Sequence, residues 1–466
     1  MIKRQVKIGP IIFISIFVLT GCAGSVGENK PWVMPSRISE GNEVYPVQHV
    51  DGYIEDGLTA LTVTSEIGQL TKIALKNNTA IKVAEARYSE AIANMKSIDA
   101  GIMPKVDIGV KTTRTRAGNE NSGVAASTSQ SSSGSVDLRI PIDLFGKIKV
   151  RRRAAAYEVE QTREELENTR IEVMRDVVVA VVDAAEQSQL QSLNKAQLET
   201  SRTSYKLTAY RYTKGQANIV DVLQQRDLVA SLEQETPRLV AERQGALDRL
   251  SLLMGALPGN VATNGFQKLP VLPEIEVVVT PIGLLGSRPN MRALKAGVDA
   301  ADSQLSSAIK DRLPSFEFSS SAIATLKSGD ISSIISSTLS AAFTFFDGGV
   351  KRAAIKARRA SRERAGTIYI EAWLNAVVEV NGLLAEEKRR ITEYALAKAR
   401  LENARNLHAA AERRYRFGAS DYLLVLTAMR TIQQQERSLL TLQSSLLRAQ
   451  IKLHTAMGGQ IIAESS

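Results

Sequence analysis

The sequence predicts a mostly α-helical protein with a smaller β part that spans a membrane, and this plan occurs twice along the chain. Three observations support the prediction. The same landmarks recur about 200 residues apart. Each copy contains a very long segment poor in glycine and proline, and each contains paired segments in which apolar and polar residues alternate.

The clearest landmark is a Tyr-x-x-Gly turn. It occurs at Tyr212 to Gly215 and again, 203 residues later, at Tyr415 to Gly418. Met-Gly pairs end both copies. The expected organisation is a signal peptide (residues 1–21), a tether (22–57), repeat 1 (58–257) with a hairpin at 104–146, a proline-containing linker (258–280), repeat 2 (281–459) with a hairpin at 314–348, and a tail (460–466).

The helical part is predicted by two uninterrupted segments. Residues 148–214 contain neither glycine nor proline, and residues 350–417 contain no proline and two glycines. At 1.5 Å per residue, each would form a helix of about 100 Å. Val425, Leu439 and Leu453 belong to an apolar series that recurs every seven residues. Such a series keeps one stripe against a partner helix and predicts coiled-coil packing.

The β part is predicted where the period changes to two. Val106, Ile108 and Val110 alternate with polar residues in the first hairpin, whose Ser- and Gly-rich residues 118–135 predict a long flexible tip. The second hairpin is expected to turn near residues 327–330. Strands of about ten residues with one apolar face suit a transmembrane barrel, although a soluble sheet packed on the helices remains an alternative. Four strands cannot close a barrel, so several copies would have to share one.

The N-terminus predicts export and lipid attachment. Lys3, Arg4 and Lys7 precede a 13-residue apolar run that is too short for a spanning helix. The run ends in Leu-Thr-Gly-Cys22, similar to the lipobox of bacterial lipoproteins, so Cys22 is the expected lipid attachment site. The alternative is a short membrane anchor with an incidental cysteine.

Composition argues against an enzyme. The formal net charge is +10, the only cysteine is Cys22, and the three histidines (His49, His408 and His454) lie far apart in sequence. One thiol excludes an intramolecular disulfide framework and any multi-cysteine metal site. No phosphate-binding loop occurs. We therefore expect no catalytic residues, no metal and no cofactor.

Taken together, these features resemble the TolC-like outer-membrane efflux family, in its lipoprotein branch. The resemblance covers about residues 58–459 and rests on the doubled plan and the two Tyr-x-x-Gly turns. Arg288-Pro-Asn-Met-Arg292, the Leu-Phe-Gly146 exit and the Phe-Asp-Gly-Gly349 exit add to it. It implies a homotrimer in which each protomer gives four strands to a twelve-stranded barrel, while the helices form a coiled-coil α-barrel through the periplasm.

The resemblance also implies that pairs of shorter helices stack end to end. The expected pairs are 71–103 with 218–254 and 281–313 with 421–457. The two turns would meet a periplasmic adaptor protein at the mouth of the tunnel, although helix caps would explain the glycines equally well. The contact candidates are Lys214, Gly215, Ala217, Gly418, Ala419 and Ser420.

Asp221 and Asp421 are the candidates for a charged aperture, because threefold symmetry would bring three carboxylates to the axis. Where many members read Leu-Asp-Ala, this chain reads Leu426-Thr427-Ala428, so the usual acidic ring is in doubt. Asp421 could instead serve only as a helix N-cap.

Basic runs follow both hairpins, at residues 147–153 and 351–364. An exported protein meets no nucleic acid, so we expect them to contact outer-membrane lipid headgroups, with a solvated helix face as the alternative.

The function expected from this resemblance is a passive outer-membrane conduit of a tripartite exporter. It would extend into the periplasm and pass small molecules such as drugs. An inner-membrane pump of the RND or ABC type would supply the energy. The alternatives are a type I protein-secretion channel and a lipid-anchored periplasmic coiled-coil scaffold without a pore.

Overall fold

The computed structural model describes residues 32, 65–119, 124–259, 266, 268–270, 283–327 and 330–458. The chain divides into two units, Met1–Pro31 and Trp32–Ser466. All helices and strands below belong to the second unit. The expected signal peptide, Cys22, the tail, all of the tether except Trp32, and most of the linker lie outside the described residues.

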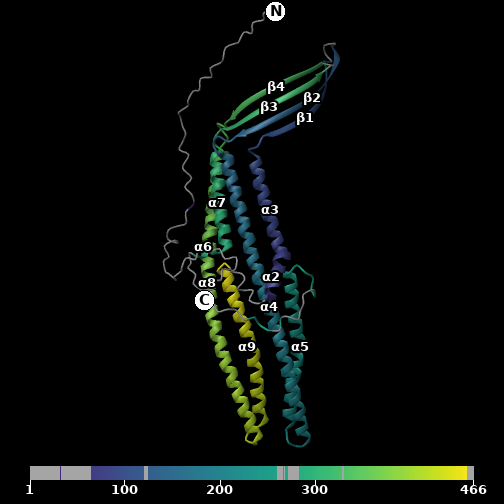
Figure 1. The fold of residues 1–466 in the computed structure, drawn as a ribbon, viewed down its shortest axis with the longest axis vertical. Coiled ribbons are helices and arrows are strands. Elements are labelled where there is room, and N and C mark those ends of the chain that lie inside the picture. The colour runs from purple at the N-terminus through teal and green to yellow at the C-terminus, as the bar shows by residue number, and fades with distance from the viewer. Residues whose placement is uncertain are drawn as a thin grey trace, which may run out of the picture. The chain divides into compact units, whose positions relative to one another are not determined.

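Within the described residues, eight helices and four strands follow one another in an order that repeats (Figure 1). They are α2 (Ser65–Asn77), α3 (Thr79–Ala100), β1 (Lys105–Asn119), β2 (Val124–Ile142), α4 (Lys147–Thr213), α5 (Ile219–Leu253), α6 (Gly283–Ser287), α7 (Pro289–Lys310), β3 (Ser315–Lys327), β4 (Asp330–Ala342), α8 (Val350–Arg416) and α9 (Tyr422–Ala456). The fold is mostly helical with a small β part, as the sequence predicted.

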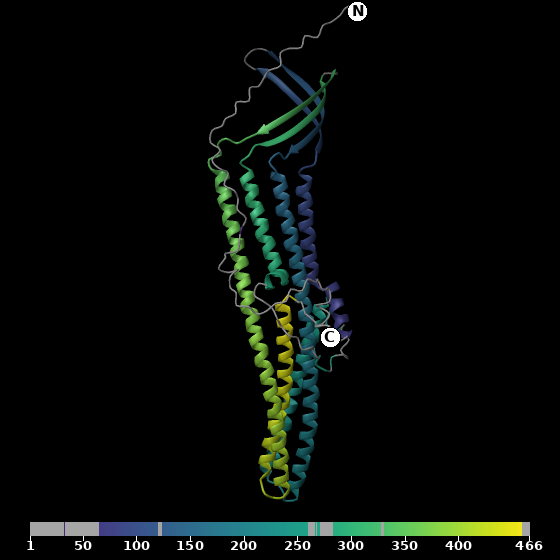
Figure 2. The same ribbon diagram turned by 60° about the vertical axis from the view of Figure 1, so that its left-hand side comes forward.

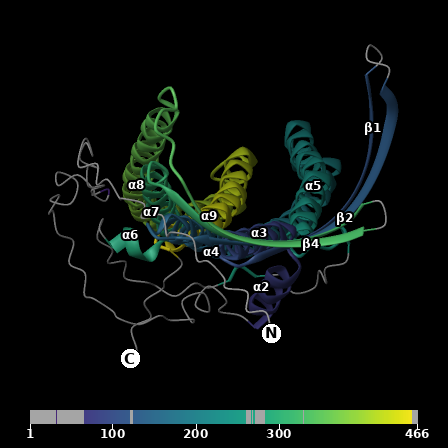
Figure 3. The same ribbon diagram turned by 90° about the horizontal axis from the view of Figure 1, so that it is seen from above.

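The four strands form one antiparallel sheet in the order β1-β2-β3-β4. Seen from above in Figure 3, the sheet is curved. Its register aligns apolar residues across the strands: one row joins Ile108, Val136, Ala322 and Ile335. Because paired residues share a face, this row and its neighbours form one apolar face on the sheet.

The predicted flexible tip at residues 118–135 is wrong. β2 begins at Val124, and Ser127 to Ser135 pair with β1 residue by residue. Serine-rich sequence lacks the apolar alternation that marks a strand, yet its backbone groups pair as well as any others. The strands therefore have 15, 19, 13 and 13 residues rather than about ten. The second turn is confirmed, since Lys327 pairs with Asp330.

The two long helices α4 and α8 are confirmed, each with 67 residues (Figure 2). Each starts after a left-handed glycine, Gly146 or Gly349. An aspartate before each glycine caps the helix start. Asp143 accepts hydrogen bonds from the N–H groups of residues 147 and 149, and Asp347 accepts from residues 349 and 351. The bonds from the N–H groups of residues 351 and 349 lower the pKa of the Asp347 carboxyl.

The helix predicted at residues 71–103 is two helices that meet at Asn78. The Asn78 side chain accepts a hydrogen bond from the N–H of Ala80 (2.8 Å) and donates one to the carbonyl of Leu253 (2.8 Å). An asparagine that caps one helix and holds the end of another favours a break over a continuous helix. In repeat 2, the helix predicted from residue 281 instead starts at Pro289, after the short α6.

The end-to-end stacking of shorter helices is confirmed. α5 ends against the α2–α3 break, where a Cβ on Gly255 would lie 2.6 Å from the carbonyl oxygen of Asn77. α9 ends against the start of α7, where a Cβ on Gly458 would lie 2.5 Å from the carbonyl oxygen of Ser287. Only glycine allows so close an approach, which explains the glycine of the Met-Gly pair that ends each repeat.

Apolar contacts hold each long helix to its shorter partners. The largest cluster joins α2, α3 and α5 to the middle of α4, around Val177, Val178 and Val182. A second cluster joins α8 to the end of α9, around Val380 and Leu453. Among the described helices, α8 alone is long and apolar enough to cross a membrane by length and composition. Its apolar stretch packs on α7 and α9.

Candidate functional site

The first Tyr-x-x-Gly turn joins α4 to α5. Lys214 is the C-cap that follows Thr213, the last residue of α4. Gly215 adopts a left-handed φ of 67°, and its N–H donates to the carbonyl of Tyr212 (2.9 Å). Asn218 then starts α5 with a reciprocal capping box: its side chain accepts from the α5 backbone, while Asp221 accepts from the N–H of Asn218 (3.2 Å).

The second turn joins α8 to α9 in the same way. Gly418 has a φ of 69° and its N–H reaches the carbonyl of Tyr415 (3.0 Å). Asp421 takes the N-cap position of α9, but its side chain makes no capping hydrogen bond within the described part of the chain. The turns share a backbone and differ in how their aspartates are used.

Side chains from the two turns meet. Tyr422 packs against Tyr415 with ring centroids 5.2 Å apart, and the Gln225 side chain donates to the Tyr422 hydroxyl (2.7 Å). The Arg211 guanidinium lies 5.0 Å from the centre of the Tyr415 ring. Burial raises the pKa of the Tyr422 hydroxyl, which stays protonated at neutral pH. These four residues tie α4 and α5 to α8 and α9.

The six predicted contact residues all lie on the two turns, which the structure brings together. Lys214, both glycines and Ala419 are exposed, and Ala217 and Ser420 are half-buried. A Cβ on either glycine would meet no described atom within 4 Å, so the outer side of both turns is open. That surface has the room that a docking partner would need.

The carboxylates of the two predicted aperture residues differ in whether they make a capping hydrogen bond. The Asp221 carboxylate is engaged in the capping box, whereas Asp421 is exposed and bears no cap bond among the described residues. Asp421 therefore occupies the N-cap position that the alternative predicted, but its carboxylate makes no capping hydrogen bond in the described structure.

A polar seam runs between α4 and α9. Arg437 donates to the side-chain oxygens of Asn194 (3.2 Å) and Gln197 (3.1 Å). Closer to the end of α9, Arg448 donates to Asp183 (2.8 Å) and pairs with the nearly buried Glu186. Leu447 and Ile451 of α9 also join the apolar cluster of α4, so these polar and charged contacts add to an apolar joint between the two helix pairs.

The sequence reasoning missed Arg211, Gln225, Tyr422 and the seam. Tyr415 belongs to the Tyr-x-x-Gly motif of repeat 2, but the motif by itself does not predict that Arg211 of repeat 1 lies against its ring. The polar residues at 194, 197, 433 and 437 interrupt the apolar stripes of α4 and α9. Buried polar residues on helices predicted to pack were the available signal.

The basic runs are used unequally. In the first, Lys147 and Arg151 pair with Asp311 (2.5 and 3.2 Å) and Arg152 pairs with Asp99 (2.8 Å). In the second, Arg352, Lys356 and Arg359 are exposed. The second run keeps more cationic surface available.

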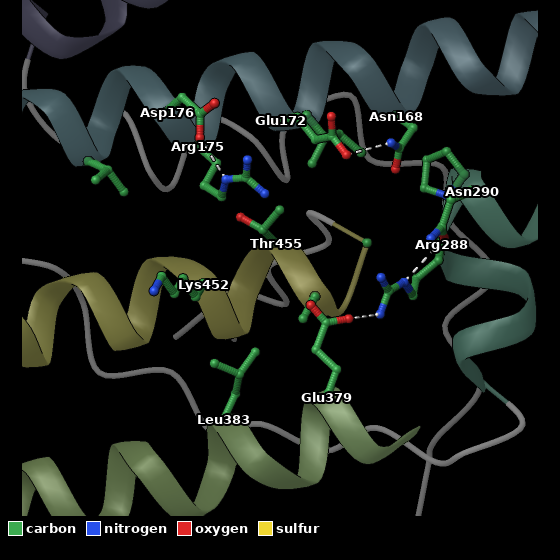
Figure 4. Close-up of a pocket in the computed structure, with 15 residues that line it drawn as sticks. Asn168, Glu172, Arg175, Asp176, Arg288, Asn290, Glu379, Leu383, Lys452 and Thr455 are labelled. Carbon is green, nitrogen blue, oxygen red and sulfur yellow. Dashed lines mark hydrogen bonds and ion pairs between the residues drawn. The ribbon is translucent and has the colours of Figure 1, made fainter. Parts of the chain in front are cut away.

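A cavity of about 470 Å³ lies where α9 ends beside the start of α7, between α4 and α8 (Figure 4). Its charges are mostly neutralised in place, as by the Arg288–Glu379 pair (2.7 Å) and the Arg175–Asp176 pair (2.8 Å). Among the described residues, no three His, Cys, Asp or Glu side chains are placed to hold a metal ion. This arrangement belongs to a helix junction.

Comparison with known proteins agrees with the fold. The pyoverdine export outer membrane protein OpmQ of Pseudomonas putida is 27% identical over 417 residues, which are 86% of this chain and 87% of that protein. The cation efflux system protein CusC of Escherichia coli K12 is 26% identical over 96% of this chain and 98% of its own length. The solved outer-membrane channel OprN superposes with a TM-score of 0.80 at 22% identity, over 88% of this chain and 94% of that one.

The model of the family described as "Outer membrane efflux protein" matches residues 70–256 and 283–459, which is most of the chain. Members of this family are outer-membrane channels rather than enzymes. The doubled helix and strand plan and the match over both copies lead to one conclusion: this chain belongs to the outer membrane efflux protein family and is a TolC-like efflux channel protein of the outer membrane.

Proposed function

We propose that three copies of this chain form one passive conduit, with a shared twelve-stranded barrel in the outer membrane and a helical tunnel in the periplasm. The observation that carries the proposal is the open four-stranded sheet. β1 and β4 each pair with one strand only in the described structure, and four strands cannot close. Pairing of β4 with β1 of the next copy satisfies both edges.

The apolar face of the sheet supports a membrane position. Ile108, Val110, Ile335 and Leu339 are between 67% and 85% exposed, so no helix covers them. A soluble sheet packed on the helices would bury this face. Lipid would cover it instead, while the serine-rich opposite face would line the lumen.

The tether supports attachment to the membrane. Cys22 would carry the lipid, and more than one acyl chain is needed to hold a protein stably. The exposed Arg352, Lys356 and Arg359 lie within seven residues of one another near the start of α8, where phosphate headgroups would neutralise them.

We place the adaptor on the two turns, at Lys214, Gly215, Ala217, Gly418, Ala419 and Ser420. Their outer side is open, and the left-handed glycines leave room for close approach by another backbone. An RND-type or ABC-type pump in the inner membrane would complete the exporter and supply its energy.

We assign the aperture to Asp421 rather than Asp221, because only Asp421 presents a carboxylate without a capping role in the described structure. Three copies would attract cations and repel anions at the mouth. Opening would require α8 and α9 to move relative to α4 and α5, along the polar seam.

The cargo would be small molecules such as drugs. The names of OpmQ and CusC refer to pyoverdine export and to cation efflux. These names differ from one another, and the partner pump would set the specificity.

The test is the native mass of the acylated protein extracted in mild detergent. Three chains per particle, with ion conductance after insertion into planar bilayers, are the expected result. A stable monomer would overturn the proposal, because four strands would remain open. A trimer without conductance would favour the periplasmic scaffold.

A further inference from the structure

Trp32 is the one residue of the tether that the structure describes, and it packs on the seam between α7 and α8. Its ring meets Tyr369 edge-on, with centroids 6.0 Å apart and planes at 79°. It contacts an apolar cluster built from Met291 and Val298 of α7 and Tyr369 and Trp373 of α8. An aromatic ring in this geometry, on an apolar cluster, makes a specific contact.

Gly366 provides the space for this ring. A Cβ on Gly366 would lie 2.3 Å from Nε1 of Trp32, 2.4 Å from Cε2 and 2.8 Å from Cζ2. No side chain fits at such distances, so the indole occupies a notch that only glycine leaves on α8. Glycine inside a helix weakens that helix. The glycine that makes room for the Trp32 ring therefore lowers the local stability of α8.

Gly382 is the other glycine within α8 and serves as a matched control for Gly366. A Cβ there would meet no described atom within 4 Å, and the residue is exposed. The two glycines share a helix and a helical environment. They differ in whether a side chain from the N-terminal segment lies on them.

Chain lengths allow Trp32 to connect a membrane anchor to this notch. Gly366 lies sixteen residues after the first residue of α8, about 24 Å along the helix. Trp32 lies ten residues after Cys22, a length of chain that spans at most about 35 Å. Pro31 and Pro35 flank Trp32 in sequence and restrict the backbone of the free chain, so docking would lose less conformational entropy.

We propose that Trp32 is the docking residue of the N-terminal tether and that the Gly366 notch on the α7–α8 seam is its receptor. The inference rests on the proposed function only in assigning the lipid to Cys22. Docking holds Trp32 on the helices. It also adds an aromatic contact across the seam, which holds α8 to α7 on the side of the helix nearest the sheet.

The first test places Trp32 alone as a fluorophore, in full-length acylated protein that carries Trp373→Phe. Gly366→Ala should shift the emission to the red and raise acrylamide quenching at least about twofold, because the indole leaves an apolar site. Gly382→Ala should leave both unchanged. If Gly366→Ala has the spectrum of Gly382→Ala, the notch does not hold Trp32 and the proposal fails.

The second test is a double-mutant cycle on the thermal unfolding midpoint, with Trp373 intact. Gly366→Ala should lower the midpoint by about 2–4 °C. Combined with Trp32→Ala, the same substitution should lower it no further, since the added methyl then fills an empty notch. A drop that persists without Trp32 would show that Gly366 packs against another group, and would overturn the assignment.

Neither test depends on transport. A docked Trp32 in a protein that proves to be monomeric would leave this inference standing while the conduit fails. A displaced Trp32 in a conducting trimer would do the reverse.

Discussion

Replacing Arg448 by methionine should weaken the joint between the two helix pairs. Arg448 of α9 donates to Asp183 (2.8 Å) and pairs with Glu186, both on α4. Methionine keeps most of the apolar stem of arginine and removes the charge. Glu186 would be left in a nearly buried position without this cation.

The magnitude follows from the burial of the three side chains. They are 26% exposed for Arg448, 19% for Asp183 and 6% for Glu186. Removing one partner from a buried ion pair costs about 3–5 kcal/mol. Asp183 retains Arg249 at 3.6 Å, and Arg448 is about a quarter exposed, so we expect a loss nearer 2–3 kcal/mol.

The assay is unfolding followed by far-ultraviolet circular dichroism in detergent, with Arg430→Met as control. Arg430 also lies on α9 and pairs with Asp227 of α5 (3.2 Å), but the two side chains are 44% and 77% exposed. An exposed pair contributes about 0–1 kcal/mol. The control should therefore shift the unfolding midpoint much less than Arg448→Met does.

A second comparison separates burial from simple loss of contact. Glu186→Gln combined with Arg448→Met removes the unpaired carboxylate and should recover part of the lost stability. Equal shifts for the Arg448 and Arg430 variants, or no recovery in the double variant, would refute the view that the seam depends on a buried charge pair.

Three further predictions concern the mouth and the helix junction. Tyr422→Phe keeps the ring but removes the acceptor of Gln225 at 2.7 Å, so the contact between the two turns should be about 1–2 kcal/mol weaker. Because the proposed opening separates the two turns, single-channel recordings should show more frequent opening, and unchanged gating would contradict this role. Gly458→Ala should destabilise the protein by more than about 2 kcal/mol, because φ at Gly458 is 94° and a Cβ there would lie 2.5 Å from the carbonyl oxygen of Ser287. The control is Gly245 of α5, where a Cβ would meet no described atom within 4 Å, so Gly245→Ala should leave the thermal stability unchanged or raise it. Burial lowers the pKa of His454 below its ordinary value of 6.5. As the pH drops below about 6.5 the unfolded chain binds a proton at His454 that the folded chain does not bind, so the stability of the fold should decrease. His454→Gln should flatten this pH dependence, and an unaltered pH profile would exclude His454 as its source.

Local pattern was enough to predict the large elements of this protein. α4 and α8 were predicted within one residue at each end, because one segment lacks both glycine and proline, the other lacks proline and has two glycines, and so long a run has no other regular structure available. The apolar sheet face around Ile108 followed from alternation alone. The stacked helices and the turns followed from the family resemblance together with the doubled landmarks.

Errors occurred where local composition and tertiary context disagree. Residues 124–135 are serine-rich and were predicted as a loop, but pairing with β1 makes them strand. Asn78 lies in a segment with helical composition, yet the helix breaks there because its side chain holds the end of α5. In both places a partner distant in sequence supplies the hydrogen bonds that decide the conformation.

The sequence by itself therefore determined the repeated plan, the helices and the apolar strand face, since these depend on residues that are neighbours along the chain. Only the tertiary structure decided which residues meet across the repeats. The Tyr422–Gln225 bond, the Arg448 seam and the Trp32 notch at Gly366 each join positions far apart in sequence. Such contacts form only after the helices have packed, because periodicity fixes the face a residue lies on and packing fixes what it touches there.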